Sequence, residues 1–89
     1  MRDDVTTKKN SIVELLKKIH PNTQFKVKED VGFFFHSDSP SIKRNLVISD
    51  LAMNKFGMDI LEFQVRHIAK DMTQLGDQKP YIWLCSYSV

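Results

Sequence analysis

The residue types that most often carry catalysis or bind metals are scattered through this sequence. Its three histidines and its single cysteine are His20, His36, His67 and Cys85. A metal site needs several such ligands at short, regular spacings, and a catalytic cysteine needs a partner histidine. These four residues lie in separate predicted elements without such spacing. We therefore predict no metal site, and we interpret Cys85 as a small buried apolar residue.

The carboxylates and glycines give no catalytic pattern either. Glu29 and Asp30 stand at a predicted turn, whereas Asp59 and Glu62 stand near the start of a predicted helix. Acidic side chains are common at both places, because they suit turns and the positive end of a helix dipole. The three glycines are isolated, so the chain lacks a glycine-rich loop that could hold a phosphate group. We expect a protein that is not an enzyme and that needs no cofactor.

Lysines close to aromatic residues give the clearest sign of a binding function. Lys26 and Lys28 alternate with apolar residues in TQFKVKE, and Phe34 and His36 follow in VGFFFH. Lysines beside an aromatic ring on a sheet are typical of surfaces that bind single-stranded nucleic acids, because bases stack on the ring and phosphates are anionic. Alternatively, a helix or a second subunit covers Phe34, and the lysines only keep the strand soluble. Other cations that we assign to this candidate site are Lys17, Lys18, Lys43 and Arg44.

The positive charge of the chain is concentrated near its beginning. The net charge is +2 over 89 residues, but residues 8–28 contain six lysines and one glutamate, which is a net charge of +5. Such a distribution affects the choice of partner rather than the choice of fold. One end of the molecule is therefore expected to be positive.

The first half of the chain predicts a helix followed by a β-hairpin. Residues 1–9 have no apolar periodicity, and we expect them to be flexible. Between Asn10 or Ser11, which can cap a helix, and Pro21, which ends one, four apolar residues recur at helical spacing. We expect the four lysines in and just before this segment to lie outside its buried stripe: Lys8, Lys9, Lys17 and Lys18.

The predicted hairpin has two possible registers. A three-residue loop, Asp30–Gly32, places the glycine at a left-handed turn position and pairs Lys28 with Phe34. This register buries Phe33 and Phe35 and turns Phe34 to the opposite face of the sheet. A two-residue loop would place Phe34 in the core instead, because one residue of slip reverses the faces of a strand. We prefer the first register because it uses the glycine.

The second half of the chain contains one ambiguous and two clear segments. Residues 45–56 fit a helix, which we prefer, but NLVIS alone fits a buried strand, with Ser49 or Asp50 capping a later helix. From Met58 to Leu75, apolar residues are spaced 3, 4, 3, 4 and 3, which predicts a long amphipathic helix. The last nine residues, YIWLCSYSV, predict a strand that is apolar on both sides, either central or covered at the edge.

Together these segments predict a small two-layer α+β domain with the order α-β-β-α/β-α-β. We expect an antiparallel sheet of three or four strands with two or three helices on one face. The length allows one core, so residues 10–89 are expected to form a single domain after the flexible N-terminus. No segment has the pattern of a signal peptide or a transmembrane helix, which predicts a soluble cytoplasmic protein with no membrane partner.

Our functional hypothesis is a small non-enzymatic binding protein. It would act as a regulator, inhibitor or adaptor through contacts with another protein, because the chain has no catalytic cluster and has more apolar strand surface than one helical layer covers. A second copy of the chain is one such partner, and the candidate interface residues are Tyr81, Trp83 and Tyr87 in the last strand. The alternative hypothesis is a module that binds single-stranded RNA or DNA on the face with Lys26, Lys28 and Phe34.

Overall fold

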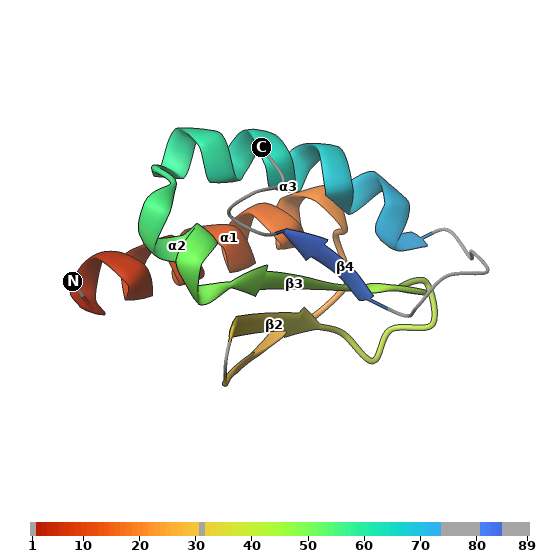
Figure 1. The fold of residues 1–89 in the computed structure, drawn as a ribbon. Coiled ribbons are helices and arrows are strands. Elements are labelled where there is room, and N and C mark those ends of the chain that lie inside the picture. The colour runs from red at the N-terminus through yellow and green to blue at the C-terminus, as the bar shows by residue number, and fades with distance from the viewer. Residues whose placement is uncertain (1, 31, 74–80, 85–89) are drawn as a thin grey trace.

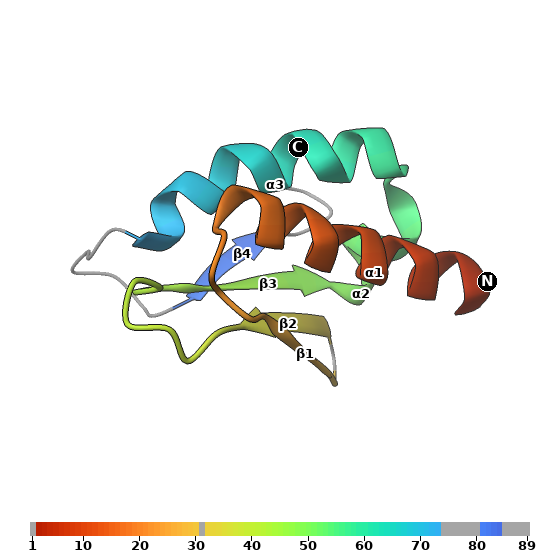
Figure 2. The same ribbon diagram turned by 180° about the vertical axis from the view of Figure 1, so that it is seen from behind.

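The computed structural model describes residues 2–30, 32–73 and 81–84, and it consists of a helical layer packed on a β-sheet (Figure 1). Both views show α1 and α3 on the same side of the sheet (Figures 1 and 2). The prediction of a small two-layer α+β domain is confirmed. In chain order the elements are α1 (Arg2–Ile19), β1 (Lys26–Glu29), β2 (Gly32–His36), β3 (Asn45–Ser49), α2 (Asp50–Lys55), α3 (Met58–Ala69), the 3₁₀ turn η1 (Lys70–Thr73) and β4 (Tyr81–Leu84).

The sheet has the strand order β1-β2-β3-β4, and it is mixed rather than wholly antiparallel. The first three strands pair antiparallel, as predicted, whereas β4 pairs parallel to β3. Helices α2 and α3 lie between β3 and β4 in the chain, and the parallel pairing means that β4 starts from the same end of the sheet as β3. A parallel neighbour requires such a crossover connection.

Helix α1 begins much earlier than its sequence pattern predicts. It starts at Arg2, so the helix start expected at Asn10 or Ser11 is wrong, and residues 2–9 are helical. Val5 packs against the core, and Lys8 is buried four residues before the fully buried Ile12. Contacts with other elements therefore stabilise two turns of helix whose local sequence gives no apolar pattern.

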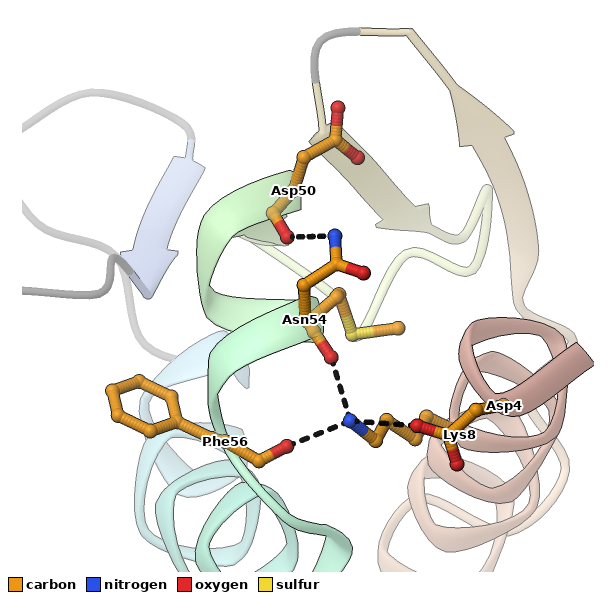
Figure 3. A network of polar contacts seen from close by, with 6 residues as sticks. Asp4, Lys8, Asp50, Asn54 and Phe56 are labelled. Atoms are coloured by element: carbon orange, nitrogen blue, oxygen red, sulfur yellow. Dashed lines mark hydrogen bonds and ion pairs between the residues drawn. The ribbon is translucent and has the colours of Figure 1, made fainter. Parts of the chain in front are cut away.

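The buried Lys8 joins α1 to the end of α2 (Figure 3). Its Nζ donates hydrogen bonds to the carbonyl oxygens of Met53, at 2.8 Å, and Phe56, at 2.9 Å, and lies 3.2 Å from the Asp4 carboxylate. The last carbonyls of a helix have no partner within the helix, so a cation at that position satisfies them. The expectation that Lys8 lies outside the buried stripe is wrong for this reason.

The hairpin adopts the register that we preferred. Lys28 pairs with Phe34, and Glu29 pairs with Phe33, which leaves a three-residue loop. The reason for the glycine differs from our prediction, because Gly32 does not have a positive φ. A Cβ atom at Gly32 would lie 2.9 Å from the carbonyl oxygen of Ile48, so the close approach of β3 demands the glycine.

Residues 45–56 form a strand and a short helix, so the preferred single helix is wrong and the alternative is correct. The strand β3 lies between β2 and β4, and Leu46, Val47 and Ile48 are all fully buried. Helix α2 then begins after Ser49, whose side-chain oxygen accepts a hydrogen bond from the Ala52 amide at 3.1 Å. The apolar triplet is buried on both faces of the sheet, which a strand achieves and an amphipathic helix does not.

The apolar seam predicted from Met58 onward faces the sheet. Leu61, Val65 and Met72 are fully buried, and Met58 and Ile68 pack against the core at its margin. Leu75, the last member of the predicted seam, lies outside the described residues. None of the helices in the described part of the chain combines the length and the apolar character that a membrane crossing requires.

Candidate functional site

The predicted binding residues of the hairpin share the face of the sheet that points away from α1 and α3. Lys28 is the cross-strand partner of Phe34, and Lys26 is the partner of His36, so all four side chains project from the same side. Phe35, between Phe34 and His36, is fully buried on the helical side. We call this surface, with the neighbouring Asn45, the outer face.

A depression of about 280 Å³ lies on the outer face. Its lining consists of Lys28, Asp30, Phe34, His36 and Asn45. The phenyl ring is half-buried, so it offers apolar surface while its position is fixed by the sheet. The surrounding side chains supply an ammonium, a carboxylate, an amide and an imidazole, so both hydrogen-bond donors and acceptors surround an apolar ring.

A second apolar residue lies next to Phe34 on this side of the sheet. Val47 is the cross-strand partner of Phe34, and it is fully buried although it does not belong to the core cluster between sheet and helices. In the backbone register, Val47 pairs in turn with Trp83, and Asn45 pairs with Tyr81. The third candidate interface residue, Tyr87, lies outside the described residues.

Charges on the outer face are mixed rather than uniformly positive. Lys26 Nζ lies 4.0 Å from the Asp38 carboxylate, and both side chains are exposed, so this pair contributes little to stability. Lys28 and Asp30 line the same depression. The positive charges of two lysines and the negative charges of two aspartates therefore cancel over this surface.

The other four predicted cations do not join the outer face. Lys17 and Lys18 are exposed on α1, and Lys18 lines a groove with Glu62 and Arg66 of α3 on the helical layer. The Arg44 side chain points to η1, where it donates a hydrogen bond to the Asp71 carbonyl oxygen at 3.3 Å. The exposed Lys43 lies in the loop before β3, and its amide donates to the Met72 carbonyl oxygen at 2.7 Å.

The histidines do not converge. His20 Nε2 lies 2.8 Å from the Ala69 carbonyl oxygen, so it donates a hydrogen bond that ties the end of α1 to the end of α3. His36 belongs to the outer face, and His67 is exposed on α3. No group of three or more His, Cys, Asp or Glu side chains suited to a metal ion exists within the described residues.

Sequence reasoning missed two residues that line the depression and three exposed apolar side chains. Asp30 and Asn45 line the depression, and only the pairing of the strands brings them together. Leu51 and Phe63 are each 70% exposed, and Ile60 is 39% exposed. Phe63 stands off the apolar seam of its helix, and this mismatch is the sequence signal that would have identified it.

No family model, no curated protein and no solved structure matches this chain.

Proposed function

We propose that this domain is a non-enzymatic binding protein that holds a segment of another protein against its outer face. In such a role it would serve as a regulator, an inhibitor or an adaptor. The observation that supports the proposal is the depression around the half-buried Phe34, with Lys28 and Asp30 at its rim. An aromatic residue surrounded by polar groups of both signs resembles the centre of many protein interfaces.

The contacts in such a complex follow from the lining of the depression. A large apolar side chain of the partner would pack on the Phe34 ring and remove it from water. Lys28 and Asp30 would form ion pairs with an acidic and a basic side chain of the partner. Asn45 would form a hydrogen bond with a backbone amide or carbonyl group. Most of the binding energy would come from the ring, because buried aromatic anchors dominate interfaces whereas charges at the rim contribute little.

A second candidate function is the binding of single-stranded nucleic acid on the same face. It is favoured by the pair of lysines on β1 next to Phe34, which match a stacking platform with phosphate contacts. Against it, Asp30 lines the depression and Asp38 lies beside Lys26, so two carboxylates would face the phosphates. We therefore rank it after protein binding.

Affinity capture with the wild-type full chain and two variants tests the proposal. The wild-type protein, Phe34→Ala and Leu51→Ala are each immobilised and exposed in parallel to a native cell lysate, with and without nuclease. We expect a protein partner that persists after nuclease treatment and whose affinity falls by about 1–3 kcal/mol in Phe34→Ala. Leu51→Ala is the control, because it also truncates an apolar side chain, but one that is exposed on α2.

Other outcomes would contradict the proposal in distinct ways. Loss of the captured material after nuclease treatment, with binding that weakens steeply as salt is added, would favour the nucleic-acid function. Capture that is equally strong for Phe34→Ala and the wild type would show that the outer face is not the binding surface. Concentration-dependent sedimentation of the purified protein would identify a second copy as the partner.

A further inference from the structure

Helix α3 exposes an aromatic side chain to solvent on the side that faces away from the core. Phe63 is 70% exposed, whereas Leu61 and Val65 on either side of it are fully buried. Arg66, His67 and Lys70 follow at three, four and seven residues, so their side chains lie along the same side of the helix as Phe63. We call these four residues the α3 stripe.

The α3 stripe lines a depression of about 430 Å³ together with Ile19 at the end of α1. Figures 1 and 2 show α1 and α3 running side by side in the same direction. Their C-terminal ends are tied by the hydrogen bond from His20 to the Ala69 carbonyl oxygen. The depression therefore lies between two fixed helix ends, and it has an apolar part formed by Ile19 and Phe63.

The described residues that line this depression include two cationic side chains, Arg66 and Lys70, and no carboxylate. Arg66 is held by Glu62 through two contacts of 3.0 and 3.1 Å, which use part of its guanidinium group. His67 and Lys70 are exposed and form no ion pair with another described residue. Asp59 stands one turn before Phe63, so the positive groups lie on the C-terminal side of the ring.

The helix dipole explains part of this arrangement but not all of it. Basic side chains in the last turn interact favourably with the negative end of a helix, which accounts for Arg66, His67 and Lys70 without any partner. It does not account for an exposed phenylalanine one turn before them, because a polar residue would serve the helix equally well there. An apolar ring with Arg66 and Lys70 on its C-terminal side suits a ligand that is both apolar and anionic.

We propose that the α3 stripe docks an acidic segment of a partner protein. The segment would place one large apolar side chain on Phe63 and Ile19, and its carboxylates next to Arg66 and Lys70. Because Asp59 repels acids at the other end of the stripe, the acidic residues would lie on the Lys70 side. This surface is on the helical layer, so it is a second contact that does not depend on the outer face.

Selection from a random peptide library tests this inference directly. Peptides displayed on phage are selected on the wild-type protein, and the best ones are synthesised for titration. We expect enriched sequences with Asp or Glu next to one large apolar residue. Their affinity should fall at least tenfold for Phe63→Ser and for Lys70→Glu, and it should stay unchanged for Leu51→Ser.

Two further measurements make the test specific. A peptide with lysine in place of its acidic residues should bind Lys70→Glu better than it binds the wild type, because the charges are then exchanged. Backbone amide shifts on titration should change near residue 19 and along the second half of α3. As a folding control, Phe63→Ser and Phe34→Ala should both keep the wild-type melting temperature within a few degrees. Phe34→Ala should also bind the peptide with wild-type affinity, and this result would show that the α3 stripe binds independently of the outer face.

The inference is overturned by any of three results. The selected peptides could lack acidic residues, or their amide shifts could lie on the outer face rather than on α3. A twelve-residue oligo(dT) could shift the same α3 amides and bind more tightly than every selected peptide, which would assign the stripe to nucleic acid instead.

Discussion

Replacement of Lys8 by methionine should cause a large loss of stability from a single side chain. Lys8 is only 8% exposed, and its ammonium group donates to the Met53 and Phe56 carbonyl oxygens and pairs with Asp4. An ammonium group has three hydrogens, and the three contacts use all of them. Methionine keeps most of the apolar stem but removes every donor.

The magnitude follows from the contacts that disappear. A hydrogen bond from a charged donor contributes about 1.5–3 kcal/mol, and a buried acceptor left without a partner costs about 1–3 kcal/mol. The ion pair with Asp4 adds only about 0.3–0.5 kcal/mol, because the Asp4 carboxylate is largely exposed. Since the two carbonyl contacts share one donor group and do not add fully, we expect a loss of about 2–4 kcal/mol.

Urea denaturation of Lys8→Met, Asp4→Asn and Lys17→Met at one pH measures this loss. Asp4→Asn should cost only a few tenths of a kcal/mol, and Lys17→Met should stay within about 0.5 kcal/mol of the wild type because Lys17 is exposed. Amide hydrogen exchange should also accelerate in α2, whose end loses its cap. If Lys8→Met unfolds within about 0.5 kcal/mol of the wild type, the proposed role of Lys8 as an internal cap of α2 is refuted.

Three further substitutions test the core and the sheet. Phe35→Ala should cost about 3–5 kcal/mol in urea denaturation and Phe34→Ala much less, so equal losses would mean that Phe34 is an ordinary core residue. Val65→Asp should abolish the cooperative thermal transition in circular dichroism, because it places an unpaired charge in the core; an unchanged transition would show that the seam is misassigned. Gly32→Ala should cost about 1–3 kcal/mol because its Cβ meets a backbone oxygen, whereas at Gly57 the same change meets only a side-chain oxygen of Asp59 and should be nearly neutral.

The hairpin and the long helix were predictable because each has a clear period. Alternation in residues 25–28 marks the two faces of the first strand, and the register fixes which side of the sheet Phe34 faces. The position of Gly32 indicated the correct register, although the glycine is demanded by the approach of β3 and not by the turn. The seam of α3 is equally regular, and a short window of sequence contains its signal.

The errors arise where contacts distant in sequence decide the local structure. Leu46, Val47 and Ile48 fit a helix by spacing, but they form a strand because β2 and β4 flank them. Lys8 breaks the apolar pattern of α1, yet it is buried because carbonyl groups at the end of α2 accept its hydrogen bonds. These contacts join residues that lie far apart in the sequence, so no local pattern contains them.

The candidate site was predictable to a similar extent. The four hairpin residues share one face because of the strand period, which the sequence contains. Lys17 and Lys18 were assigned to the same site by charge alone, and the structure places them on the helical layer. Charge indicates what a residue attracts, but only the packing of α1 against the sheet determines on which side it does so.

The parallel fourth strand has a consequence for the order in which the chain folds. Strands β1 to β3 pair within residues 26–49, whereas Asn45 and its β4 partner Tyr81 are 36 positions apart in the sequence. Because long loops are slow to close, we expect β4 to join the sheet last, after α3 has packed. Until then one edge of β3 is unpaired, and the β4 segment of another molecule can occupy it. Refolding at high concentration should therefore yield strand-exchanged dimers, and refolding at high dilution should yield monomers.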